Sequence, residues 1–204
     1  MFRHTALFLL RPETTPDQRA EMLRGLASLE ATCPTVRALD FGENALASAG
    51  PPGAYDVALH LDFDDTEGYA AYFADPGHSE VAEFNASISA AGRTARVDWH
   101  PTDSRQGDAR HVAAFVWADG ALHAEALAAA RGLAGAPGVV SAAVAENAGD
   151  DARAWDWILD VAFADLAAAR TFLASEAYRA AMSAVATAVV AEATAHLTHL
   201  RRSS

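Results

Sequence analysis

The chain has 204 residues, of which 51% are hydrophobic and 21% are charged, a composition typical of a folded globular protein. All fifteen basic residues are arginine, so a lysine Schiff base and a Walker-type phosphate-binding lysine are excluded. The net charge of −12 argues against nucleic acid and anionic membranes as partners, and the single cysteine, Cys33, excludes an internal disulfide. The apolar runs at 5–10 and 180–191 are shorter than a signal-peptide core and a membrane span, respectively, which favours a cytoplasmic location.

The hydrophobic pattern of the first hundred residues predicts seven elements. A strand at 2–10 precedes a helix that begins after Thr14 or Thr15 and has Pro16 in its first turn. Residues 55–63 alternate apolar and polar side chains, which is the period of a strand with one buried face. The other expected elements are strands at 36–41 and 94–99, a short helix at 66–72 and a longer helix at about 78–91. Such an order is typical of a ferredoxin-like antiparallel sheet with helices on one face.

The two halves of the sequence repeat each other. Arg3-His4-Thr5-Ala6 recurs 107 residues later as Arg110-His111-Val112-Ala113, and Phe63 corresponds to Phe163 at a separation of 100. The falling separation indicates that the second copy has lost about seven residues in its loops, where deletions are tolerated. The repeat therefore predicts a duplicated unit.

Each unit covers one face of its sheet with helices and leaves the other face in need of a partner, which the repeat supplies in the same chain. The polar stretch 100–109 lacks apolar periodicity and is predicted to be the linker. We therefore expect an α+β protein, with one unit at 1–99 that holds the candidate active site and a degenerate unit at 110–204.

The segment Tyr72-Phe73-Ala74-Asp75-Pro76-Gly77-His78 resembles the Tyr-x-x-x-Pro-x-His segment of the stress-responsive dimeric A/B barrel family. The Arg-His opening of the first strand and the strand that ends in Phe63 are similar as well. The resemblance covers residues 1–99 and, in part, 110–200. In that family two ferredoxin-like units pack sheet against sheet, so the resemblance implies two tandem units that form an intramolecular dimeric α/β barrel.

Within this family, the resemblance to olivetolic acid cyclase can be followed residue by residue. Its catalytic tyrosine and histidine correspond to Tyr72 and His78, and its first-strand histidine corresponds to His4. The resemblance implies that His78 is a general base and that Tyr72 donates a hydrogen bond to a carbonyl that becomes an enolate or alkoxide. A further pocket histidine of that enzyme falls at Val57, where this sequence departs from the pattern. The expected substrate-binding wall consists of His4, Phe8, Val57 and Leu59.

The same residues also have purely structural interpretations. His78 can cap the longer helix, Tyr72 can be a core aromatic residue, and His4 can be a buried histidine bonded to the backbone. His60 is expected on the opposite strand face, toward the barrel interior or solvent, with solvation favoured. A metal site there is not expected, because alternate residues of a strand, such as His60 and Asp62, project in parallel and define no fourth ligand.

The second unit is predicted to keep the scaffold without the chemistry. Phe172 and Tyr178 stand where the first unit has its tyrosine and histidine, and Trp157 adds bulk on the same strand face as Val57 in the first unit. We therefore expect a ligand-sized cavity in the first unit and a filled or narrowed one in the second. His196 and His199 are three residues apart on a strand and should face opposite ways.

Taken with the resemblance, the residues predict a cofactor-independent enzyme that acts on a small apolar carbonyl compound. The expected activity is a polyketide-type aldol cyclase or a related carbon–carbon lyase. The alternatives are a non-catalytic ligand-binding or stress-response barrel protein and a cofactor-free oxygenase or haem-handling barrel. No metal or cofactor is expected, and the chain itself supplies the partner sheet.

Overall fold

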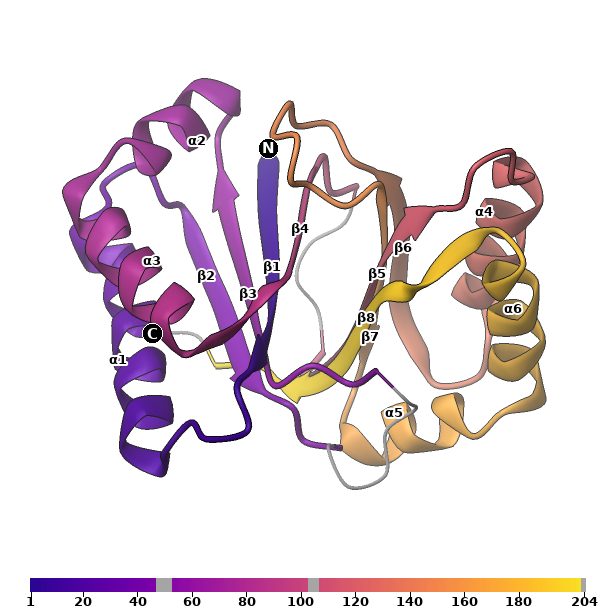
Figure 1. Cartoon of the computed structure of the whole chain (residues 1–204). Helices are drawn as coiled ribbons and strands as arrows, with labels where there is room; N and C mark the ends of the chain where they lie inside the picture. Colours follow the sequence, from indigo (N-terminus) through magenta and orange to yellow (C-terminus); the bar gives the residue numbers. More distant parts are fainter. Residues whose placement is uncertain (47–52, 103–106, 203–204) are drawn as a thin grey trace.

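The computed structural model describes residues 1–46, 53–102 and 107–202, and it places two sheets between outer layers of helices (Figure 1). The first unit contains β1 (Phe2–Leu10), α1 (Pro16–Thr32), β2 (Ala38–Glu43), β3 (Val57–Phe63), α2 (Thr66–Phe73), α3 (Pro76–Ile88) and β4 (Ser89–Trp99). The second unit contains β5 (Ala109–Trp117), α4 (His123–Gly132), a 3-10 turn (Leu133–Gly135), β6 (Val139–Glu146), β7 (Trp157–Phe163), α5 (Leu166–Leu173), α6 (Glu176–Ala186) and β8 (Val189–Leu200).

Both sheets are antiparallel and have the same strand order, β2-β3-β1-β4 in the first unit and β6-β7-β5-β8 in the second. In each unit the helices lie on the outer face of the sheet, and the inner faces of the two sheets are turned toward each other (Figure 1). The expected pair of ferredoxin-like units within one chain is therefore confirmed. The expected linker runs between β4 and β5, but its residues 103–106 lie outside the described residues, so the domain limits stay a prediction.

Polar side chains fix the helix starts in both units. Thr15 forms a capping box with Gln18 at the start of α1. At the starts of α2 and α5, Asp65 and Asp165 each accept a hydrogen bond from the backbone N–H three residues later. Helix α3 begins at Pro76, two residues earlier than expected. The side chain of Asp75 caps it by accepting a hydrogen bond from the backbone N–H of Gly77, and proline is favoured in the first turn of a helix.

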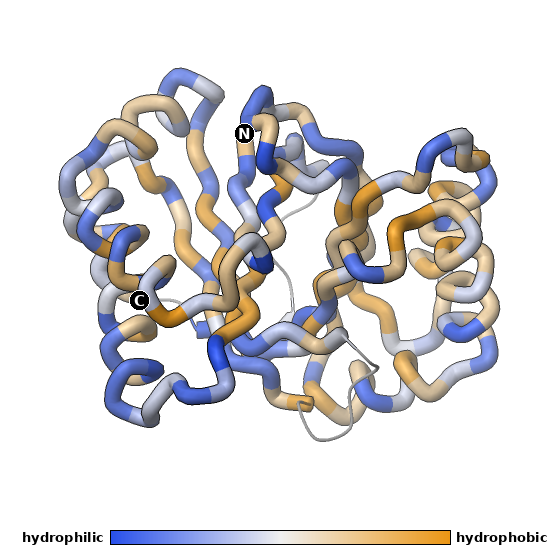
Figure 2. Tube along the Cα trace, viewed as in Figure 1, coloured by the Kyte–Doolittle hydropathy of each residue, from blue (hydrophilic) through white to orange (hydrophobic). Residues whose placement is uncertain are grey.

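Apolar side chains from both sheets form a central core between the units. This core includes Leu7, Val97 and Trp99 from the first sheet and Val112, Ile158 and Leu197 from the second. A separate core lies under the helices of each unit. Because successive side chains of a strand point to opposite faces, each central strand contributes to two cores. Figure 2 shows hydrophilic residues along these central strands as well as hydrophobic ones, so the sheet interface also buries charge.

A chain of ion pairs crosses the sheet interface. Arg3 binds Asp62 in the first unit, with 2.6 Å between Nε and Oδ1, and also lies 3.6 Å from Asp160 of the second unit. Arg110 of the second unit binds Asp160 and lies 3.6 Å from Asp40 of the first unit. All five side chains are buried. Removal of one partner from such a network leaves an uncompensated buried charge and is strongly destabilising.

The expected solvation of His60 is wrong. Its side chain has no exposed surface, contacts the hydroxyl of Thr5 through Nδ1 at 3.1 Å, and stacks on His199 of the second sheet with ring centroids 5.5 Å apart. Thus His60 lies in the sheet interface because its strand face is covered by the second unit. His199 faces this interface while His196 faces the helices, as predicted from their spacing.

Segments of each unit also pair with an edge strand of the other. In the first unit, Ala54 and Asn44 form bridges to His196 and His199 of β8. In return, the backbone N–H of Trp155 in the second unit donates to the carbonyl of Arg96 on β4 at 2.7 Å. The backbone N–H of Ala148 donates to the carbonyl of Asp98 on the same strand at 2.6 Å. The outer edges of β4 and β8 are therefore covered by the opposite unit.

In the part of the chain that the structure describes, the two sheets are not joined by continuous strand pairing. They face each other and are joined at isolated bridges, but they do not close into one continuous barrel. The expected barrel is thus realised as two facing sheets. Among the described helices, none is both long enough and apolar enough to cross a membrane.

Candidate functional site

The expected site residues of the first unit gather around a cavity between the sheet and helices α1 and α3. The cavity has a volume of about 60 Å³. Five of the six candidate residues line it: His4, Phe8, Leu59, Tyr72 and His78. Val57 is buried in the same core but does not line the cavity. The structure therefore brings the proposed base and hydrogen-bond donor into one small chamber, while their roles stay predictions.

A tight helix–helix turn holds Tyr72 and His78 together. Tyr72 is in the last turn of α2 and His78 is in the first turn of α3, and the backbone N–H of Asp75 donates to the Tyr72 carbonyl at 3.1 Å. The two ring centroids are 4.3 Å apart. Tyr72 is buried, and this burial raises the pKa of its phenol well above the ordinary value, so the hydroxyl keeps its proton at neutral pH.

His78 has the protonation state of a base. Its Nδ1 lies 3.3 Å from the carbonyl oxygen of Phe73. A carbonyl can only accept a hydrogen bond, so this contact places the proton on Nδ1 and leaves the lone pair on Nε2. Partial burial lowers the pKa of His78 below its ordinary value. The neutral form, which can accept a proton, therefore predominates at neutral pH.

A second histidine in the cavity is paired with a carboxylate. Nδ1 of His4 lies 2.6 Å from Oδ1 of Asp98, and both side chains are buried. The two residues are direct neighbours in the β1–β4 ladder. The ring of Tyr69 stacks on His4 with centroids 5.3 Å apart. Because the carboxylate accepts the Nδ1 proton, His4 has its second nitrogen, Nε2, available for another hydrogen bond.

Two further polar side chains line the same cavity. Arg96 is the neighbour of Ala6 in the β1–β4 ladder, and its guanidinium makes no hydrogen bond or ion pair with the described residues. Asn85 on α3 is buried, and its Oδ1 has no hydrogen-bond partner there. Both groups therefore have hydrogen-bonding capacity left for a ligand.

Sequence reasoning missed Arg96 and Asn85 as cavity residues and Asp98 as the partner of the cavity residue His4. Alternation along the last strand of the unit places Arg96 and Asp98 on one face, and this signal was available. The pairing of Asp98 with His4, in contrast, depends on the register between two strands, because the two residues are 94 positions apart in the sequence. Nothing in the helical pattern of α3 marks Asn85, because only its burial distinguishes it from a surface residue.

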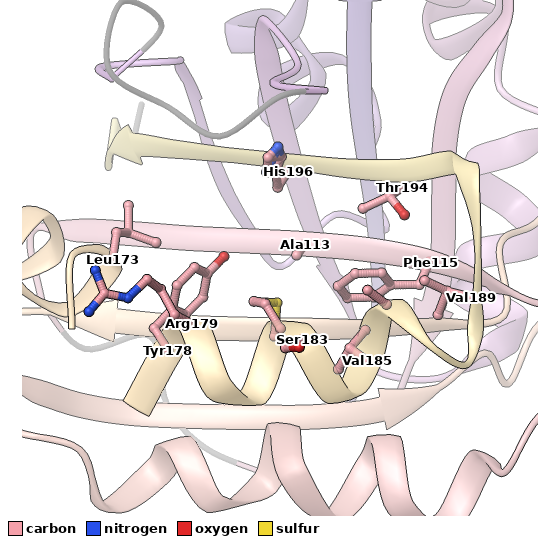
Figure 3. A pocket seen from close by; sticks show the side chains of 12 residues that line it. Ala113, Phe115, Leu173, Tyr178, Arg179, Ser183, Val185, Val189, Thr194 and His196 are labelled. Carbon is pink, nitrogen blue, oxygen red and sulfur yellow. The ribbon is translucent and has the colours of Figure 1, made fainter. Parts of the chain in front are cut away.

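The expectation that the first unit has the larger cavity is wrong. A cavity of about 460 Å³ lies in the second unit, between β5, β8 and α6 (Figure 3). Trp157 does not fill it, because its ring stacks on Phe115 at 4.2 Å and on Trp117 at 5.1 Å. Phe172 packs on Phe163 at 5.1 Å instead. The bulky side chains are therefore accommodated by stacking on other aromatic rings.

The helices explain the difference in volume between the two cavities. In the first unit, α1 has 17 residues and places Leu26 and Leu29 against the cavity. In the second unit, α4 has only 10 residues, its buried residues are Ala126, Leu127 and Ala130, and none of its residues lines the cavity. The shorter helix therefore leaves open the space that leucine side chains of α1 fill in the first unit.

The chemistry of the two cavities differs at corresponding ladder positions. The neighbours of His4 and Ala6 on β4 are Asp98 and Arg96, whereas the neighbours of the corresponding His111 and Ala113 on β8 are Thr198 and His196. Nε2 of His111 lies 3.0 Å from the hydroxyl of Tyr178, and Nδ1 lies 2.9 Å from the hydroxyl of Thr198. Burial lowers the pKa of His111 to about 3 and that of His196 to about 4. Both histidines are therefore uncharged at neutral pH.

Comparison with known proteins identifies one family for the first unit. Residues 2–100 match the family model described as the stress responsive A/B barrel domain. No curated protein matches the chain.

Solved structures resemble either the whole chain or half of it. A crystal structure described as an anthrone oxidase-like protein matches 99% of this chain and 92% of its own, with 15% identity and a TM-score of 0.70. A putative monooxygenase from Fusobacterium nucleatum matches 99% of this chain and 91% of its own, with 7% identity and a TM-score of 0.56. A dimeric ferredoxin-like protein of unknown function from Thermobifida fusca matches 49% of this chain and 90% of its own, with 30% identity and a TM-score of 0.43. The first two show that the two-unit fold occurs in other proteins.

Proposed function

We propose that the first unit, whose residues 2–100 belong to the stress responsive A/B barrel domain family, is an enzyme. In this proposal it catalyses proton transfer at a carbonyl compound without a cofactor. The observation that carries the proposal is the contact between Tyr72 and His78, with ring centroids 4.3 Å apart in one cavity. The two side chains form a hydrogen-bond donor and a base, which is the pair that enolate chemistry requires.

In the proposed reaction, Nε2 of His78 removes a proton from the carbon next to a substrate carbonyl. The hydroxyl of Tyr72 donates a hydrogen bond to the carbonyl oxygen, on which negative charge develops. The guanidinium of Arg96 lines the same cavity and adds positive charge for this oxygen. In an aldol cyclisation, the enolate carbon then bonds to a second carbonyl carbon of the same molecule, and His78 returns the proton to the new alkoxide. In a carbon–carbon lyase the steps run in reverse: His78 removes the proton of the substrate hydroxyl, the carbon–carbon bond breaks, and the resulting enolate takes the proton back.

The cavity volume limits which part of the substrate is enclosed. About 60 Å³ holds a reacting group but not a whole ligand, since ligand pockets are usually 300 Å³ or more. A hollow of about 460 Å³ adjoins it and shares Ala86, Thr94 and Arg96 as lining residues. This hollow extends to Trp155 of the second unit. We infer that the remainder of an apolar polyketide-like substrate lies there, with its carbonyl end at His78.

Removal of either group of the pair tests the proposal. With a panel of open-chain polyketones and β-hydroxyketones followed by NMR, Tyr72→Phe should lower turnover about a hundredfold, the effect of losing one oxyanion donor. His78→Ala should abolish turnover and leave the circular dichroism spectrum unchanged.

Tyr55→Phe is the matched control, because it removes a buried tyrosine hydroxyl in the sheet interface, away from the cavity. Its turnover should equal that of the unchanged protein. Full activity of both Tyr72→Phe and His78→Ala on a confirmed substrate would instead assign these residues a structural role, as in a non-catalytic binding protein.

A cofactor-free oxygenase is the second candidate, because it shares the first step. The same deprotonation gives an electron-rich enolate that can react with O₂, and the two similar full-length structures are described as an oxidase-like protein and a putative monooxygenase. An oxygen electrode separates the two candidates. Substrate consumption without O₂ uptake supports the cyclase or lyase, and stoichiometric uptake supports the oxygenase.

A further inference from the structure

The cavity of the second unit differs in volume and lining from the cavity of the first. We propose that it binds an uncharged, mainly apolar molecule that carries one hydroxyl or carbonyl group. This site is separate from the proposed catalytic cavity, and the inference does not depend on the proposed function.

The size and lining of this cavity suit a small organic molecule. Its volume of about 460 Å³ lies within the usual range of ligand sites, roughly 300–1,000 Å³. Figure 3 shows Phe115, Val185 and Val189 gathered around one end of the cavity, with Ala113 on its β5 wall. Apolar side chains predominate around the cavity, so burial of an apolar ligand is favoured.

One polar group of the cavity is fixed in place. Tyr178 extends from α6 into the cavity, and its hydroxyl is held by Nε2 of His111 at 3.0 Å, while Nδ1 of His111 contacts the hydroxyl of Thr198 at 2.9 Å. If Nε2 carries the proton of the neutral imidazole, the Tyr178 hydroxyl can donate to a ligand. If Nδ1 carries it, the Tyr178 oxygen can accept. A ligand hydroxyl satisfies both arrangements, and a ligand carbonyl satisfies the first.

The cavity offers its ligand no internal charge. The first unit has Arg96 and Asp98 at the ladder positions where the second has His196 and Thr198. His196 lines the cavity as a neutral imidazole, because its burial opposes protonation. Arg179 is exposed at the border of the cavity, where its charge is solvated. An ionised ligand would therefore lose its hydration without gaining a buried counter-charge.

Direct binding measurements with 1-naphthol as the probe test the proposal. Naphthalene serves as the apolar comparator and 1-naphthoate as the charged one, with all three followed by isothermal titration calorimetry. We expect saturable binding of 1-naphthol and at least tenfold weaker binding of 1-naphthoate. Tyr178→Phe should weaken the binding of 1-naphthol about tenfold and leave that of naphthalene unchanged, because only the former uses the hydroxyl.

Two variants locate the probe. Ala113→Leu places three more carbon atoms in the cavity and should lower the affinity for both 1-naphthol and naphthalene. Ser183→Phe narrows the cavity from an exposed position on α6 and provides the same test should Ala113→Leu fail to fold. Tyr55→Phe, a hydroxyl deletion outside the cavity, should bind 1-naphthol as the unchanged protein does.

Several results would overturn the proposal. These are the absence of 1-naphthol binding at millimolar concentration, equal affinity for 1-naphthoate, and unchanged 1-naphthol affinity in Tyr178→Phe or in the folded cavity-filling variant. Because none of these measurements involves turnover, they stand apart from the tests of Tyr72 and His78.

Discussion

At the scale of single residues, the histidines of the two cavities differ in burial and therefore in pKa. His78 is only half-buried, so its pKa is lowered moderately and it can still exchange protons. In the second unit, burial lowers the pKa of His111 to about 3 and that of His196 to about 4, values far below the working range of a general base at neutral pH. The same residue type thus serves as a proposed base in one unit and as a neutral hydrogen-bonding group in the other.

The lowered pKa of His78 predicts how activity depends on pH. Only neutral imidazole accepts a proton, so kcat/KM should rise with pH through the pKa of His78 and then reach a plateau. Because burial shifts this pKa downward, the midpoint of the acid limb should lie below the ordinary value of about 6.5. A pH–rate profile with a confirmed substrate measures it. A midpoint above 6.5 would contradict His78 as the base.

At the scale of elements, the strand β4 connects the proposed catalytic cavity to the second unit. Its residue Asp98 binds His4 on one side, and its backbone N–H donates to the side chain of Asn147 at 2.9 Å. Gly149 lies against the Asp98 carboxylate so closely that a Cβ there would be 2.6 Å from Oδ2. The segment that follows β6 in the second unit therefore positions Asp98, the residue that binds the cavity residue His4 of the first unit.

This close approach predicts a large effect for Gly149→Ala. The added methyl group must displace Asp98, so the hydrogen bond to His4 should break, and turnover should fall about tenfold or more. Stability should fall by about 1–3 kcal/mol, as in other overpacked sites. Turnover assays and urea denaturation measure the two effects.

Gly135→Ala is the matched control, since the Cβ that it adds meets no described heavy atom within 4 Å apart from its chain neighbours and the backbone of its own turn. Its turnover should equal that of the unchanged protein. Equal turnover in Gly149→Ala as well would show that the position of Asp98 does not matter for the reaction.

The elements themselves were largely predictable, because they depend on local patterns. Thr15 and Pro16 mark a helix start in the sequence, and the repeat predicted two units of the same topology. The cavities were not predictable in this way. Whether Trp157 fills the cavity of the second unit or stacks on Phe115 depends on packing in three dimensions. The pairing of His4 with the carboxylate of Asp98 depends on it too.

At the scale of the whole molecule, buried charge joins the two units. Arg110 of the second unit lies between Asp160 and Asp40, and Arg201 provides a further contact to Asp40 at 3.2 Å. Among the described residues, the cations that contact the buried carboxylate of Asp40 both come from the second unit, so the first unit alone leaves this charge unpaired. The buried charge network therefore depends on the pairing of the two sheets.

The variant Arg110→Met tests this network. It keeps a long side chain but leaves Asp160 and Asp40 without their central cation, so stability should fall by about 3–5 kcal/mol. Arg37→Met is the control, because Arg37 forms an exposed pair with Asp64 and should cost less than about 1 kcal/mol. Denaturant unfolding measures both. A similar small loss in the two variants would contradict a structural role for the buried network.

The reciprocal pairing at β4 and β8 has a consequence for how the chain is made. At roughly 5–20 residues per second, the ribosome needs about 5–20 s to add the second unit after the first has emerged. During that time the outer edge of β4 lacks its partner segment from the second unit, and Asp40 lacks Arg110. An uncovered strand edge recruits other strands. The nascent first unit is thus most prone to pair with a neighbouring copy before its own second half arrives.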